Sequence, residues 1–93
     1  MSKPRRTVKR VVDGDTFEVA RRVGESRFVR LAGVNAPEKR FQGGRKATNT
    51  LRGLIGGQKV IIDPVARDKY GRVVANVKKS RKSVNKRMKE KGY

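Results

Sequence analysis

Apolar and polar residues alternate along much of the first third of the chain, which is the two-residue period of half-buried β-strands. The pattern predicts three strands, over Thr7–Val12, Thr16–Arg21 and Arg27–Gly33. In the third strand, alternation puts Phe28 and Arg30 on one face and Val29 and Leu31 on the other. Asp13-Gly14-Asp15 separates the first two strands, and Asp-Gly is typical of hairpin turns.

Pro37 interrupts the strand pattern, because proline cannot donate to a β-ladder. The period then changes to that of a helix. Ala47, Leu51, Leu54 and Ile55 fall at i, i+4, i+7 and i+8, which makes one apolar stripe along a helix. Glycines at 56 and 57 are expected to end this helix.

The remaining pattern predicts two more strands and a short helix. The strands are expected over Lys59–Asp63, which stops before Pro64, and over Arg72–Val77. Val84 and Met88 could anchor a C-terminal helix with Ser83 as its N-cap. The resulting order, β-β-β-α-β-β-α, predicts a five-stranded OB-fold barrel, an all-β barrel with helices.

The chain has 93 residues, which is enough for one domain over 1–93. Residues 1–6 are expected to form a flexible basic arm, and residues 78–93 a basic C-terminal helix and tail. There is no apolar run long enough for a transmembrane helix and no signal-peptide pattern after the basic N-terminus. We therefore expect a cytoplasmic protein that does not bind membranes, or a secreted one if a signal peptide has been removed.

The net charge of +18 comes from 26 Lys and Arg against 8 Asp and Glu. Nucleic acid, an anionic membrane surface or an acidic protein could each balance such an excess. We favour nucleic acid, bound electrostatically by basic residues that include Lys78, Lys79, Arg81 and Lys82. Because there is no Cys and no His, thiolate and imidazole chemistry are excluded. Carboxylates, Arg, Lys and a hard metal ion remain.

Three segments could carry that chemistry. Asp13 and Asp15 could offer carboxylate oxygens to Ca²⁺ or Mg²⁺, although the segment also fits an ordinary turn. Arg30 lies inside an apolar strand, where a charge requires an anionic partner. Segment 68–72 combines charged residues with Tyr70, but alone it is typical of a surface loop.

Together, VVDGDTFEV, VRLAGVNAPE and DKYGRVVANV, followed by VN in the last helix, resemble the staphylococcal nuclease family, also called thermonuclease or SNase-like domains. This resemblance implies a Ca²⁺-dependent nuclease that hydrolyses DNA or RNA. Its metal ligands would be Asp15, Asn35 and the Ala36 carbonyl, with Asp13 next to them. The resemblance further implies catalysis by Arg30, Arg72 and Glu38, and a nucleotide site lined by Lys69 and Tyr70.

One site position differs from the family pattern. Asn35 stands where the family usually has Asp, so one negative charge is lost and Ca²⁺ is expected to bind weakly. A non-catalytic or weakly active nucleic-acid-binding module of the same family is therefore an alternative. A third reading is an interaction module that contacts an acidic protein. A monomer is expected, and the choice between DNA and RNA stays open.

Overall fold

The computed structural model describes residues 3–93 and contains six strands and two helices in that range. The elements are β1 (Arg5–Asp13), β2 (Thr16–Val23), β3 (Ser26–Leu31), α1 (Gly44–Ile55), β4 (Lys59–Arg67), β5 (Val73–Lys79), β6 (Lys82–Ser83) and α2 (Val84–Glu90). Five of these strands close into a barrel, as the sequence predicted.

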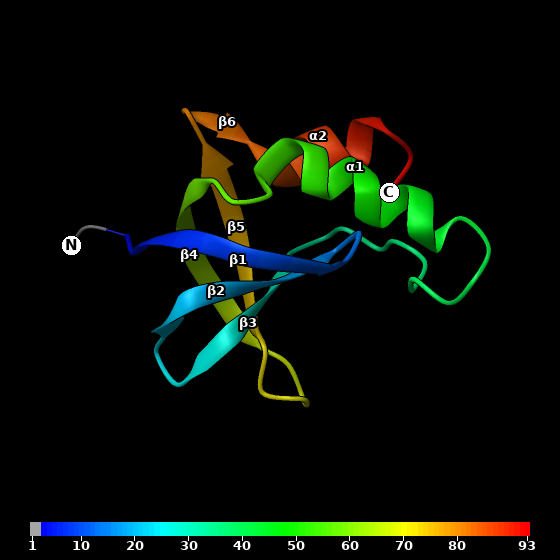
Figure 1. The fold of residues 1–93 in the computed structure, drawn as a ribbon. Coiled ribbons are helices and arrows are strands. Elements are labelled where there is room, and N and C mark those ends of the chain that lie inside the picture. Colours follow the sequence, from blue (N-terminus) through cyan, green and yellow to red (C-terminus); the bar gives the residue numbers. More distant parts are fainter. Residues whose placement is uncertain (1–2) are drawn as a thin grey trace.

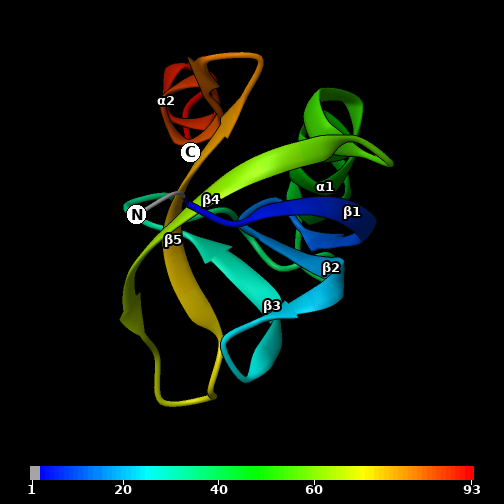
Figure 2. The same ribbon diagram turned by 90° about the vertical axis from the view of Figure 1, so that its left-hand side faces the viewer.

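The strands follow the order β3-β2-β1-β4-β5-β6, and the barrel closes through a parallel pairing of β3 with β5. Leu31 lies opposite Ala75 in that closing pair. Both helices lie at one end of the barrel, at the top of Figures 1 and 2, whereas the β2–β3 and β4–β5 connections lie at the other end. Neither helix within residues 3–93 has the length and hydrophobicity to span a bilayer.

The predicted alternation and helical stripe are both confirmed. Val29 and Leu31 are fully buried in the core, whereas Phe28 on the opposite face of β3 is exposed. In α1, the side chains of Ala47, Leu51 and Ile55 are buried against the barrel. The helix thus covers an end of the barrel that would otherwise expose apolar strand residues to water.

The prediction of a flexible arm over residues 1–6 is wrong for its last part. Arg5 and Arg6 belong to β1 and lie opposite Ile61 and Val60 of β4. Pro4 also accepts a hydrogen bond from the Ile62 N–H through its carbonyl. The first two residues of the predicted arm lie outside the described residues. The composition of residues 3–6 is typical of a flexible tail, but pairing with the sequence-distant strand β4 makes Arg5 and Arg6 part of the sheet.

Other strand limits also differ from the prediction. β4 continues through Pro64 to Arg67, because a bulge between Pro64 and Ala66 accommodates the missing N–H. β3 ends at Leu31, and Gly33 then adopts a φ of 72° that most residues avoid. The strand β6 was not predicted. It forms a hairpin with β5.

Ser83 caps α2 as predicted, since its hydroxyl accepts a hydrogen bond from the Lys86 N–H. The buried Asn85 fastens this helix to the barrel. Its amide oxygen accepts from the Val77 N–H at 2.8 Å, and its Nδ2 donates to the carbonyls of Ala32 and Ala75. This side chain therefore links α2 to β5 and to the end of β3, next to the segment that follows β3.

Candidate active site

Asp15 lies in the tight turn between β1 and β2 and is only 8% exposed. Its Oδ1 accepts a hydrogen bond from the Thr16 hydroxyl at 2.8 Å, and its Oδ2 accepts one from the Ala36 N–H at 3.2 Å. Gly14 allows the turn to pack closely against helix α1, because a Cβ at this position would lie 2.6 Å from the Cβ of Ala47. The turn, the segment after β3 and helix α1 therefore meet around one carboxylate.

Arg30 has the anionic partner that its place in an apolar strand requires. It lies opposite Thr16 in the β2–β3 pair, and its Nη2 is 3.6 Å from the Oδ2 of Asp15. Its Nη1 donates to the Leu31 carbonyl at 3.4 Å. One quarter of the side chain is exposed, so a solvent-borne anion can still reach the guanidinium.

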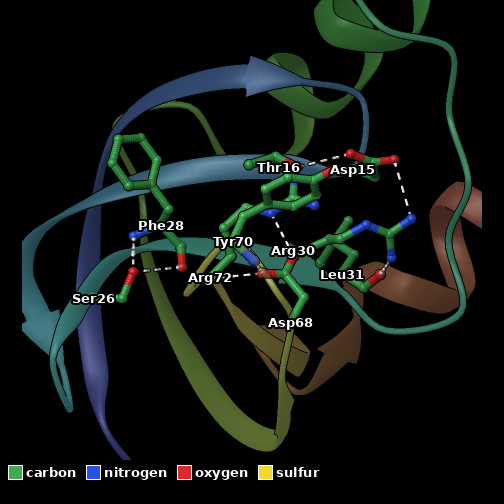
Figure 3. A network of polar contacts seen from close by, with 9 residues as sticks. All are labelled: Asp15, Thr16, Ser26, Phe28, Arg30, Leu31, Asp68, Tyr70 and Arg72. Atoms are coloured by element: carbon green, nitrogen blue, oxygen red, sulfur yellow. Dashed lines mark hydrogen bonds and ion pairs between the residues drawn. The ribbon is translucent and has the colours of Figure 1, made fainter.

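Arg72 reaches the same place from the loop between β4 and β5. Its Nη1 donates to the Thr16 hydroxyl oxygen at 3.3 Å, so Thr16 contacts both Asp15 and Arg72 (Figure 3). Arg30 and Arg72, from segments far apart in sequence, thus converge on two adjacent residues. The structure brings these two predicted residues together.

Asp68 holds Arg72 in this orientation. Its Oδ1 accepts from the backbone N–H groups of Tyr70 and Arg72, both at 2.9 Å, and its Oδ2 accepts from the Nε of Arg72 at 2.6 Å. Desolvation by burial would raise the pKa of Asp68, but these donors outweigh it and lower the pKa below its ordinary value. Asp68 therefore stays ionised and oriented at neutral pH.

Tyr70 stands beside this cluster with 72% of its surface exposed. The guanidinium carbon of Arg72 lies 5.4 Å from the centre of its ring, and the Nζ of Lys69 lies 5.2 Å from it. Both separations are within the range of cation–π contacts. The ring is thus positioned near Arg72 and is accessible to a planar ligand (Figure 3).

Glu38 lies on the segment that runs beside the β1–β2 turn. The Lys39 N–H donates to the Oδ1 of Asp13 at 2.9 Å, which fastens this segment to the turn. The Glu38 side chain itself is 60% exposed and pairs with the Nε of Arg40 at 3.2 Å. Among residues 3–93 it forms no ion pair with Arg30 or Arg72, so the structure places it beside the site without direct contact.

The oxygen donors around Asp15 suit a hard cation in type but carry little charge. The Ala36 N–H bond to Asp15 brings segment 35–36 next to the carboxylate, and Asn35 is exposed there. Within the described part of the chain, no group of three or more acidic, His or Cys side chains is arranged to hold a metal ion. One carboxylate with an amide and a carbonyl oxygen is a donor set that fits weak Ca²⁺ binding.

The predicted basic residues lie elsewhere. Lys78, Lys79, Arg81 and Lys82 surround the β5–β6 turn, at the end of β5 opposite Arg72 (Figure 1). The Nζ of Lys79 donates to the Leu54 carbonyl at 2.9 Å, near the end of α1. The structure therefore does not join this group to the Arg30–Arg72 site.

Two residues that shape the site had no assigned role in the sequence analysis. Thr16 connects Asp15 with Arg72, and Asp68 orients Arg72. The i, i+4 spacing of Asp68 and Arg72 was a usable signal, because such a spacing can place opposite charges together when the loop turns tightly. The contact of Thr16 with Arg72 spans 56 positions and has no local signal.

Comparison with known proteins finds a family and several relatives that this chain resembles. The family model described as staphylococcal nuclease homologue matches residues 28–93. An uncharacterised endonuclease of Escherichia coli is 40% identical over 70 residues, which cover 75% of this chain and 45% of that protein. An uncharacterised endonuclease of Haemophilus influenzae is 33% identical over 85 residues, covering 91% and 48%. Protein ParB of Escherichia coli is 39% identical over 70 residues, covering 75% and 39%.

The chain spans less than half the length of each of these relatives. The family model, in contrast, covers well over half of this chain, from β3 to the C-terminal residue. The matched range includes Arg30, Glu38, Asp68 and Arg72. The chain belongs to the staphylococcal nuclease homologue family.

Proposed function

We propose that this chain carries the phosphodiesterase site of a nuclease that hydrolyses DNA or RNA with the help of Ca²⁺. The observation that carries the proposal is the convergence of Arg30 and Arg72 on Asp15 and Thr16. Two guanidinium groups at one place form a site for a single phosphate, because each presents a planar fork of donors to phosphate oxygens.

Cleavage of a phosphodiester builds negative charge on the phosphoryl oxygens. Arg30 and Arg72 are held by Asp15 and Asp68 before any substrate arrives. Such preorganised cations stabilise the developing charge without reorganising during the reaction. Tyr70 lies beside Arg72, where its exposed ring can support a nucleoside next to the bound phosphate.

Glu38 is the proposed proton acceptor for the attacking water. It lies on the segment fastened to Asp13 and Asp15, and the chain offers no His for this role. To act, its carboxylate has to leave the exposed Arg40 pair, which is a weak interaction at the surface. Asp15, Asn35 and the Ala36 carbonyl would hold Ca²⁺. When bound, the ion supplies Lewis acidity toward the phosphoryl oxygens.

The test is cleavage of single-stranded DNA and RNA oligonucleotides with Ca²⁺ and with EDTA. We expect Glu38→Gln to lower the cleavage rate by about 10²–10⁴-fold, the contribution typical of a general base. Glu90→Gln in α2 is the matched control, since Glu90 is also an exposed carboxylate, and it should leave the rate unchanged. Cleavage that survives Glu38→Gln would rule out the assigned base.

A binding module without catalysis is the second candidate. Both oxygens of the Asp15 carboxylate already have protein partners, and Asn35 brings no charge to the site. This candidate predicts salt-sensitive oligonucleotide binding that EDTA does not alter, and no cleavage with any divalent ion. Those two results together would replace the enzyme proposal.

A further inference from the structure

A second basic surface lies on the outside of the barrel, away from Arg30 and Arg72. It is a shallow depression of about 260 Å³, and four cationic side chains line it. These are Arg5 of β1, Lys59 of β4, Lys78 of β5 and Arg81 of the β5–β6 turn. We name it the distal basic groove.

Strand register explains why these cations share one face. Arg5 lies opposite Ile61, and Ile61 lies opposite Lys78, so the three side chains project from the same side of the sheet. Lys59 is two residues before Ile61 on β4 and therefore projects to that side as well. The barrel thus aligns a cation from β1 with cations from β4 and β5, which lie far from β1 in the sequence.

None of the four cations is neutralised within residues 3–93. Their side chains form no ion pair or hydrogen bond there, and all four are exposed. No acidic residue lines the groove. Asp63 lines the adjacent depression, where it is paired with Lys3 at 3.5 Å. Four unpaired cations around one depression repel each other, and an external anion would relieve that repulsion.

The turn that carries Arg81 is independently unusual. Ser80 and Arg81 have φ angles of 51° and 69°, and they are the only two non-glycine residues with positive φ in the described range. Two-residue hairpin turns of this kind favour Asn-Gly, because both positions require positive φ. A backbone outlier that the sequence could easily relieve points to a use for the side chain it presents.

We propose that the distal basic groove binds the phosphate backbone of the same nucleic-acid strand that occupies the Arg30–Arg72 site. β5 separates the two, and its seven residues span roughly 20 Å at about 3.3 Å per residue. At a spacing of about 3.4 Å per stacked nucleotide, this corresponds to about six nucleotides. The groove therefore makes binding depend on the length of the strand.

This inference rests on the proposed nucleic-acid substrate but not on cleavage. Binding is therefore measured in EDTA, by fluorescence anisotropy, with single-stranded DNA of about 4 and about 20 nucleotides. The test variant is Arg5→Gln/Lys59→Gln/Lys78→Gln. The control, Arg21→Gln/Arg27→Gln/Lys46→Gln, removes the same charge from other exposed positions.

The test variant should bind the long strand on the order of tenfold more weakly, and its salt slope should fall by about 2, at about 0.7 per lost phosphate contact. The short strand should be unaffected, and the control should lose much less. Equal losses in both triple variants would show that net charge alone matters and would overturn the proposal. Polyglutamate and anionic phospholipid vesicles are titrated as alternative polyanions. The proposal would equally be overturned if the test variant lost affinity for one of these and kept its affinity for the long DNA strand.

A second variant separates the role of Arg81 from damage to the fold. Ser80→Asn/Arg81→Gly gives the turn its favoured residues, so the midpoint of thermal unfolding should rise. The affinity for the long strand should nevertheless fall by about threefold, since one phosphate contact is lost. An unchanged or higher affinity would show that Arg81 takes no part in binding the strand. Cleavage of the short strand reports on the Arg30–Arg72 site separately, so the two proposals can fail independently.

Discussion

The Asp68 carboxylate binds Arg72 twice, through the backbone N–H at 2.9 Å and through Nε at 2.6 Å. These bonds leave the outer nitrogens of the guanidinium free to face Thr16 and a substrate. Arg72 is thus aimed by its own loop, whereas Arg30 is aimed by Asp15 across the β2–β3 pair. The two arginines are therefore paired with two different carboxylates.

Replacing Asp68 by Asn should misplace Arg72 without removing it. The amide nitrogen of Asn cannot accept a hydrogen bond from Nε. The guanidinium then loses its bond to residue 68 and keeps only its bond to the Thr16 hydroxyl. A displacement on the order of 1 Å at a reacting group can cost about 10²-fold in rate, and we expect a loss of that size in kcat. Steady-state cleavage of an oligonucleotide measures it.

Glu25→Gln is the control for this substitution. Glu25 forms a carboxylate–arginine pair with Arg67 at 3.5 Å, but its side chain is 88% exposed. Activity should not change in this variant. If Asp68→Asn retained full kcat, the orientation of Arg72 by Asp68 would have no part in the reaction.

The lowered pKa of Asp68 also predicts how stability depends on pH. Desolvation would raise the pKa of this carboxyl, but the donors from Arg72 and Tyr70 lower it below the unfolded-state value of about 3.9. Ionised Asp68 therefore stabilises the fold above about pH 4, and this contribution is lost as the pH falls through the folded-state pKa.

Urea unfolding of the natural chain and of Asp68→Asn at a series of pH values tests this linkage. The difference in free energy of unfolding should be largest near neutral pH and should shrink as the solution becomes more acidic. Glu18 has a lowered pKa for the same reason, chiefly its hydrogen bond from Arg10, but it is present in both proteins and cancels. A difference that is constant with pH would contradict the linkage.

The sequence predicted the parts of this molecule that depend on local period. Alternation grouped Val29 with Leu31 on one face of a strand, helical spacing placed Leu51 and Ile55 on one apolar stripe, and all four side chains are buried. These predictions succeed because burial of apolar side chains decides the conformation at each of those positions. The barrel topology followed from the resulting order of elements.

What the sequence did not predict depends on partners far along the chain. The local sequence around Arg6 is typical of a basic tail, and only its pairing with Val60 makes it part of a strand. Pro64 is typical of a strand end, and only a bulge in the pairing with β5 lets β4 continue through it. In the same way, Thr16 meets Arg72 only because the barrel closes. Glu38 shows the converse case, since its exposed side chain pairs with its near neighbour Arg40 and forms no ion pair with Arg30 or Arg72 among residues 3–93.

Substituting Asn35 by Asp should strengthen Ca²⁺ binding. The change adds a second carboxylate next to Asp15 in a segment that already contacts it through the Ala36 N–H. Because Ca²⁺ affinity rises with the charge of its ligands, we expect the dissociation constant to fall by about tenfold or more. Isothermal titration calorimetry with Ca²⁺ measures this directly.

The control for that titration is Asp15→Asn in the Asn35→Asp background. It restores the original charge while keeping the new carboxylate, and the gain in affinity should disappear. If Asn35→Asp bound Ca²⁺ no better than the natural chain, Asn35 would not belong to a cation site.

Gly44, the first residue of α1, tests whether the position of the Glu38 segment matters. A Cβ on Gly44 would lie within van der Waals overlap of the Glu38 carbonyl oxygen and 2.8 Å from the Cα of Lys39. Gly44→Ala therefore forces the helix start and this segment apart. We expect a destabilisation of about 1–3 kcal/mol, as for other overpacked sites, and a loss of activity of about tenfold or more from the displaced Glu38.

Gly53→Ala is the matched control in the same helix. Apart from its chain neighbours and the backbone of its own helix, no atom lies within 4 Å of a Cβ built on Gly53. Alanine there should therefore increase stability, by about 1 kcal/mol at most, through its higher helix propensity. Urea unfolding and oligonucleotide cleavage measure both variants. We expect Gly44→Ala to lower both stability and activity, and Gly53→Ala to raise stability and leave activity unchanged. This pair of results would separate the effect of the contact with the Glu38 segment from the effect of helix propensity. Full activity in Gly44→Ala would show that the Glu38 segment tolerates displacement, and Glu38 could then not be the proton acceptor at a fixed place.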